Sequence, residues 1–279
     1  MPVTAGASTM KLMPGQLAAF LRRDLREALT YKFSFVSSLA GIFLSSATFY
    51  FVAKLVPRGT PSLDAFGGDY FSFAVVGVAF SSLLGMFQEG LPSVVRGAQV
   101  SGTLEALLVT PASIPTVLVG SSLYSLLFQV FRTALHLAVA LAFFGLTLGR
   151  VNAPGFFAVG VLTVLCFLSV GVLSASFILV YKTGNPFAWI FGTVSGLFGG
   201  VVFPVSLLPP WLRWISRLLP VTYALNGMRK SLLASAAFAE ILPDIAALAV
   251  FAAVLLPLGL FAFRLAVRKA KKDGTLAQF

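Results

Sequence analysis

Residues that commonly carry enzymatic chemistry are scarce in this sequence. His136 is the only histidine and Cys166 the only cysteine among 279 residues, and Asp and Glu together number nine. A lone histidine without ligand or base partners forms neither a metal site nor a nucleophile–base pair. No G-x-x-x-x-G-K-[ST] segment occurs, so the loop that holds the phosphates of ATP in P-loop proteins is absent. We therefore expect this chain to be no enzyme and to hold no metal or cofactor.

One group of polar residues has a spacing that matters. Ser125, Gln129, Arg132 and His136 stand three or four residues apart within an apolar segment, which places them on one face of a helix. A charge inside a membrane helix is costly and normally faces protein, water or headgroups. The stripe predicts either the lining of a substrate path or a structural role, as an inter-helix hydrogen-bond seam or as an Arg132 side chain that reaches the membrane surface.

The composition shows what kind of element must position these residues. Hydrophobic residues make up 58% of the chain and charged residues 10%, whereas a soluble domain carries about 25% charged residues. The solvent for most of the chain is therefore lipid. The net charge of +11 is typical of Lys and Arg at the anionic cytoplasmic leaflet. We expect no nucleic-acid partner, because the Phe residues lie inside apolar runs and not beside a basic groove.

Long apolar runs predict a single all-α integral membrane domain over residues 1–279. A membrane helix needs about 20 residues, and apolar runs without alternation exclude a barrel. The predicted spans are residues 33–54, 70–88, 116–146, 156–181, 187–207 and 245–264. Six spans place both termini on one side, and the larger share of Lys and Arg on that side predicts that it is the cytoplasm.

Three segments outside the spans have patterns of their own. Residues 14–31 predict an amphipathic interfacial helix on the cytoplasmic leaflet. Its apolar face contains Leu17, Phe20, Leu21 and Leu25. Residues 89–115 predict a cytoplasmic loop that contains a short capped helix at 103–109. Residues 208–240 predict an outer segment that begins with an interfacial or re-entrant helix, whose tryptophans suit the headgroup level.

Small residues recur every four positions in two predicted spans. Ser37, Gly41 and Ser45 lie in the first span, and Gly192, Gly196 and Gly200 lie in the fifth. Small residues at this spacing let helix backbones approach closely, either between two subunits or within one.

Two stretches resemble the membrane subunits of type-2 ABC transporters. The cytoplasmic stretch SGTLEALLVTP lies between the second and third spans, five residues after Arg96. The family's signature in this position is an Arg-rich segment followed by S-G-T-L-E and then T-P. Its matching residues are Ser101, Gly102, Thr103, Leu104, Glu105, Thr110 and Pro111. A second match follows the fifth span, at Phe203, Pro204, Leu208, Pro209, Trp211, Leu212, Pro220, Thr222, Tyr223 and Arg229. With the six-span layout and the amphipathic start, the resemblance extends over nearly the whole chain.

The resemblance implies a division of labour. Two such subunits, identical or paralogous, pair around a path through the bacterial inner membrane, with the first and fifth spans near their interface. Each docks a separate P-loop ATPase subunit, which binds ATP and Mg²⁺, and the motif at 101–111 couples the two. The family implies export of a drug, lipid or glycan, and the few polar groups in the spans favour an amphiphilic substrate. The alternatives are an ion-coupled transporter that uses Arg132 and His136 as a relay and, more weakly, a membrane scaffold without transport.

Overall fold

The chain forms a bundle of helices in the parts that the computed structural model describes, which are residues 32–57, 59–100, 114–181 and 185–272. Every regular element in these ranges is helical, which confirms the predicted all-α fold. The long helices are α2 (Lys32–Ala53), α3 (Tyr70–Val100), α5 (Ile114–Phe144), α6 (Ala153–Tyr181) and α10 (Phe238–Lys272). The shorter elements are η1 (Pro61–Phe66), α7 (Pro186–Phe198), η2 (Val205–Leu207), α8 (Pro210–Arg217) and α9 (Pro220–Leu232).

Five of the helices in the described ranges are long and apolar enough to cross a membrane. They are the five long helices, so the prediction of a multi-pass membrane protein is confirmed. The segment expected as a fifth span contributes α7, whose 13 residues extend about 20 Å at 1.5 Å per residue. That length is short of a hydrocarbon core about 30 Å thick. The total of six spans stays a prediction.

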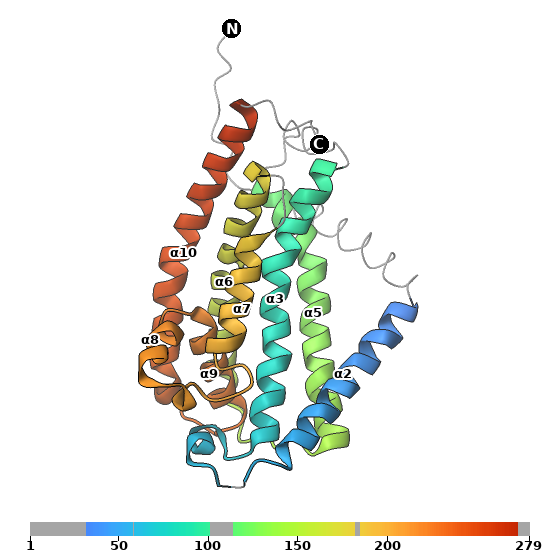
Figure 1. Cartoon of the computed structure of the whole chain (residues 1–279), viewed down its shortest axis with the longest axis vertical. Coiled ribbons are helices and arrows are strands. Elements are labelled where there is room, and N and C mark those ends of the chain that lie inside the picture. The colour runs from blue at the N-terminus through green and yellow to red at the C-terminus, as the bar shows by residue number, and fades with distance from the viewer. Residues whose placement is uncertain (1–31, 58, 101–113, 182–184, 273–279) are drawn as a thin grey trace.

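Helix α6 is at the centre of the packing. It packs against α10 and α3, and α3 packs in turn against α5. These helices run side by side, whereas α2 meets the bundle near its own C-terminal end and leans away from it toward its N-terminal end (Figure 1). The main core joins α3, α6, α9 and α10. Its fully buried side chains include Phe87, Phe167, Leu225 and Leu248.

Two long helices extend beyond the apolar runs that predicted them. Helix α3 continues through Pro92 to Val100, so the first part of the expected loop 89–115 is helical. Helix α10 begins at Phe238, passes through two prolines and continues to Lys272. Both extensions bury apolar side chains in a second core around α6. Leu91 and Val95 of α3 and Ala266 and Ala270 of α10 belong to it together with Ala175 and Leu179 of α6. Tertiary packing therefore keeps these segments helical although their composition is less apolar.

The segment after α7 turns back into the protein. Helix α7 ends at Phe198, and Gly200 adopts a left-handed backbone with φ 77°, a conformation that glycine adopts at low cost. Helix α8 then exposes Trp211 and Trp214, as expected of an interfacial helix, whereas α9 is buried along most of its length. Residues 208–240 therefore contribute a core element as well as an interfacial one.

At Gly77, helix α3 packs closely against the segment that turns back after α7. A Cβ at residue 77 would collide with the carbonyl oxygen of Val201 and with the guanidinium of Arg229. Gly85, two turns further along α3, has open space at the corresponding position. Of these two positions, packing therefore requires glycine only at residue 77.

We predict that Gly77→Ala destabilises the protein by about 1–3 kcal/mol, because the added methyl group displaces backbone and a buried guanidinium. Gly85→Ala is the matched control. We expect it to be neutral or to stabilise the protein by up to about 1 kcal/mol through helix propensity. Thermal unfolding of the purified protein in detergent measures both, and equal stability of the two variants would contradict the close approach.

Candidate functional site

Two groups of predicted site residues lie outside the described ranges. They are the ATPase-coupling residues Ser101, Gly102, Thr103, Leu104, Glu105, Thr110 and Pro111, and the apolar face of the interfacial helix, Leu17, Phe20, Leu21 and Leu25. Their roles stay predictions. The helices on either side of the coupling segment are described, however: α3 ends at Val100 and α5 begins at Ile114. Any movement of the coupling segment therefore acts directly on α3 and α5.

A polar pocket lies between α2, α3 and α5. Gln129, Arg132 and His136 of α5 line it, as their helical spacing allows. Its volume is about 80 Å³. The facing residues are Gly41, Ile42 and Ser45 of α2 and Val78, Ala79 and Ser82 of α3, and Thr133 completes the lining. Ser125, the fourth residue of the predicted stripe, is not part of this lining.

The pocket lies deep between the helix ends. Its residues on the three helices are 8 to 15 positions from Ala53, Tyr70 and Phe144, the ends that meet at one end of the bundle in Figure 1. At 1.5 Å per residue this is about 12–22 Å, near the middle of a hydrocarbon core about 30 Å thick.

Most of the polar side chains that α5 contributes to this pocket have no hydrogen-bond or ion-pair partner in the described part of the chain. Gln129 is 8% exposed and His136 is 6% exposed, while Arg132 is half-buried. None of these three side chains forms a hydrogen bond or ion pair with another residue in the described part of the chain. Only Thr133 is satisfied, because its hydroxyl donates to the carbonyl oxygen of Ala79 at 3.3 Å. Buried polar groups normally have partners, so this pocket is a candidate binding site.

The other face of α5 borders an apolar groove. Phe80 and Leu83 of α3, Leu137 of α5 and Phe157 and Val161 of α6 are among its lining residues. Its volume is about 460 Å³, and the only hydroxyl groups in its lining belong to Thr133 and Thr163. Helix α5 thus separates a polar pocket from an apolar groove.

The small-residue stripes take different positions in the structure. On α2, Gly41 and Ser45 line the polar pocket and Ser37 is exposed. On α7, a Cβ at Gly192 would lie 3.2 Å from the side-chain oxygen of Gln88, whereas Gly196 is exposed with open space around it.

Gly200 differs from the sequence-based expectation. It lies beyond the last residue of α7 in a buried left-handed turn, because the helix ends there to let the chain return. It therefore does not share a helix face with Gly192 and Gly196. A role for the remaining small residues at a dimer interface stays a prediction.

Arg229 of α9 is the structural residue that sequence reasoning missed. The side chain is 1% exposed. Its guanidinium donates to the carbonyl oxygens of Phe73 at 3.1 Å, Gly200 at 2.7 Å and Val201 at 2.6 Å, and it lies 3.5 Å from the centre of the Phe73 ring. Burial lowers the pKa of Arg229 to about 9, which leaves the group charged at neutral pH.

A signal for this burial was present in the sequence. Arg229 stands four residues after Leu225 and eight after Val221, so it shares the apolar face of its helix. This position indicates that the side chain of Arg229 is buried, but it does not show which groups satisfy the charge. From the sequence we predict only that Arg229 lies in the outer segment 208–240.

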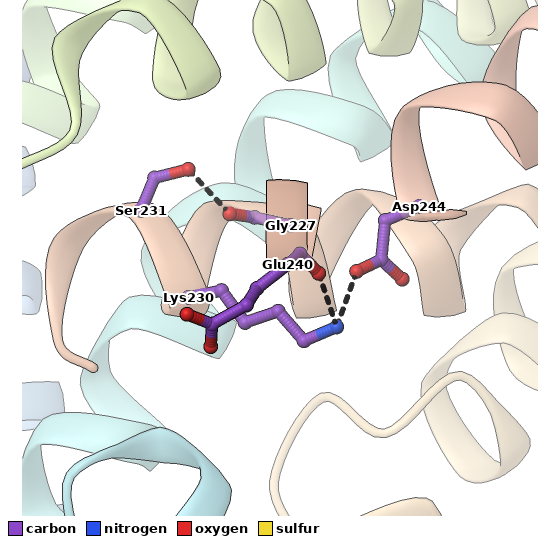
Figure 2. A network of polar contacts seen from close by, with 5 residues as sticks. All are labelled: Gly227, Lys230, Ser231, Glu240 and Asp244. Carbon is purple, nitrogen blue, oxygen red and sulfur yellow. Dashed lines mark hydrogen bonds and ion pairs between the residues drawn. The ribbon is translucent and has the colours of Figure 1, made fainter. Parts of the chain in front are cut away.

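Neighbouring Lys230 forms an ion pair that links α9 to α10. Its ammonium group donates to Oδ2 of Asp244 at 2.7 Å and to the backbone carbonyl of Glu240 at 3.3 Å. Figure 2 shows the Lys230 side chain between these two groups at the beginning of α10. Arg229 and Lys230 therefore fix α9 from two sides, toward α3 and toward α10.

Asn185 fixes the other end of α7. Its side-chain oxygen accepts hydrogen bonds from the backbone N–H of Ala188 at 3.1 Å and from the hydroxyl of Ser174 at 2.6 Å. Its side-chain N–H donates to the carbonyl of Gln88 at 3.2 Å. One amide thus caps α7 and attaches it to α6 and α3, so the position of α7 depends on those two helices.

Comparison with known proteins gives one family and a small group of relatives. A family model described as ABC-2 type transporter matches residues 15–233. The chain is also similar to the inner membrane transport permease YadH of Escherichia coli strain K12, of Escherichia coli O157:H7 and of Shigella flexneri. In each case 27% of the residues are identical over 183 positions, which cover 65% of this chain and 70% of the relative.

The environments of Arg229 and Arg132 predict different results when each arginine is replaced by methionine. Arg229→Met leaves at least two turn carbonyls without a donor, so we expect a loss of about 2–5 kcal/mol in the free energy of unfolding. Arg132→Met removes a group without a protein partner, so we expect a change of less than about 1 kcal/mol. Thermal unfolding in detergent measures both variants. A loss for Arg132→Met as large as that for Arg229→Met would show that Arg132 belongs to a structural seam.

Proposed function

Because this chain belongs to the ABC-2 type transporter family and is a transmembrane permease subunit of an ABC transporter, we propose that its helices form the export path for an amphiphilic substrate. The family implies an ATP-binding partner subunit. In this proposal that partner holds ATP and Mg²⁺ and carries out hydrolysis, and this chain contributes the membrane path.

The observation that carries the proposal is the polar pocket at mid-membrane depth. Gln129 and His136 are more than nine-tenths buried there without a protein partner, and an unmatched polar site in the hydrocarbon region is normally functional. The surrounding helices are otherwise apolar. A substrate that is mostly apolar but has one polar end fits such a path better than a fully hydrophilic solute.

The chain connectivity supports coupling between this pocket and an ATPase. Helices α3 and α5 provide two of the pocket walls, and the segment that joins them, residues 101–113, contains the SGTLEALLVTP motif. In the proposal this segment lies in the cytoplasm, as do both termini, and docks the ATPase subunit through Glu105 and its neighbours. Closure of the ATPase pair then shifts α3 against α5 and changes the pocket.

The proposal also includes a second copy of this chain or a paralogue. Ser37 on α2 and Gly196 on α7 are exposed, and small exposed residues in a membrane helix allow another helix to approach. Large apolar side chains surround Gly196 on the same helix, including the exposed Trp189 and Leu197. This surface suits a protein partner within the bilayer.

Cysteine cross-linking tests the assembly in a Cys166→Ala background, which removes the only cysteine. Glu105→Cys should cross-link to the ATPase subunit, and Gly196→Cys should cross-link to a second permease subunit. Val254→Cys, at an exposed position of α10, is the control and should form neither product. Efficient labelling of Glu105→Cys from outside intact cells would refute both the topology and the docking.

Reconstitution tests the function itself. We expect the chain and its ATPase subunit in proteoliposomes to move amphiphiles only with ATP, and the amphiphile to stimulate hydrolysis. Arg132→Ala should reduce that stimulation by about tenfold, equivalent to about 1.4 kcal/mol, with basal hydrolysis and folding preserved. Transport by the chain alone under an ion gradient would instead favour the ion-coupled alternative.

A further inference from the structure

We propose that the polar pocket between α2, α3 and α5 binds the anionic headgroup of an amphiphile, a phosphate ester or a free carboxylate, whose apolar part stays in the bilayer. This inference rests on the proposed function, which it deepens by stating the charge and the class of the substrate.

The charge of the pocket is the first argument. Among the described residues that line the pocket, Arg132 is the only permanent cation and none carries a carboxylate. An uncompensated cation at mid-membrane depth is costly, and an anionic ligand offsets that cost when it binds. A guanidinium also recognises phosphate or carboxylate through two parallel hydrogen bonds. The electrostatics therefore select an anion.

The neighbouring donors are the second argument. Gln129 and His136 lie one turn on either side of Arg132, and both are more than nine-tenths buried without a protein partner. Together with the hydroxyl of Ser45 they line the same pocket as Arg132. An anion with several oxygens accepts hydrogen bonds from all of these groups at once. A neutral headgroup would leave the guanidinium unmatched.

The size and the access route are the third argument. A volume of about 80 Å³ holds only a few water-sized groups, which fits one small anionic group and not a glycan or a drug ring. Gly41 leaves open space at the α2 wall, and α2 leans away from the bundle toward its N-terminal end (Figure 1). Leu44 and Phe131, the chain neighbours of the lining residues Ser45 and Arg132, are exposed apolar side chains. A headgroup can therefore enter from the bilayer while its chains remain in lipid.

Lipid binding to the purified full-length chain tests the proposal without ATP or the partner subunit. Native mass spectrometry would measure retention of phosphatidylglycerol and phosphatidic acid, with diacylglycerol of the same chain length as the probe that carries no anion. We expect at least tenfold tighter binding of the anionic lipids. Arg132→Gln should abolish this preference, and Arg150→Gln, which removes an exposed arginine outside the pocket, should preserve it.

Further variants keep the test independent of folding. Gln129→Leu and His136→Leu each remove donors with only a small change in side-chain volume, and each should weaken anionic lipid binding several-fold. If Arg132→Gln does not fold, these variants and Arg132→Lys, which keeps the charge but loses the bidentate geometry, decide the question. Unchanged anionic preference in every pocket variant would overturn the proposal.

Two control ligands identify the source of the anion. Inorganic phosphate at millimolar concentration should not displace phosphatidylglycerol, because a free ion gains nothing from the apolar surface at the opening. Full displacement by phosphate, or equal retention of diacylglycerol, would overturn the lipid headgroup assignment. Selective binding without ATP-driven transport would refute export and leave this site standing, whereas transport without selective binding would do the reverse.

Discussion

The N–H groups of a buried guanidinium need hydrogen-bond acceptors. In this protein the backbone carbonyls of a turn accept from Arg229. Arg229 holds the carbonyls of Gly200 and Val201 and reaches the carbonyl of Phe73 on α3. This can occur only because α7 ends early, Gly200 adopts a left-handed backbone and residue 77 has no side chain. The returning segment, α9 in the core and the outer part of α3 all depend on this one contact.

The same residue type has the opposite status elsewhere in the bundle. Arg229 is fully satisfied by the protein, whereas Arg132 lines a pocket in which Arg132, Gln129 and His136 have no hydrogen-bond or ion-pair partner among the described residues. A satisfied buried charge stabilises one structure, because removing any partner leaves a costly group behind. An unsatisfied buried charge can instead pair with a ligand. We therefore assign Arg229 to the architecture and propose Arg132 for ligand binding.

In the proposed function, the same arrangement connects the polar pocket to the ATPase subunit. Helices α3 and α5 lie on both sides of the coupling segment and on two sides of the pocket, while α2 contributes the third wall and stands partly apart from the bundle (Figure 1). A shift of α3 against α5 would change the pocket directly, because both helices line it. Asn185 attaches the start of α7 to α3 through its hydrogen bond to the carbonyl of Gln88. A shift of α3 would therefore also reach α7.

The sequence by itself determined the membrane environment, the helical fold, the family and the face of α5 that carries Gln129, Arg132 and His136. These properties follow from hydrophobicity summed over about 20 residues, from helical spacing and from short motifs, all of which are local. The tertiary structure decided the early end of α7, the burial of α9, the helical extensions of α3 and α10, and the separate positions of Gly192, Gly196 and Gly200. It alone distinguished Arg229 from Arg132, because the cost of a buried charge depends on partners that are distant in sequence, such as Phe73 and Gly200, and no local pattern contains them.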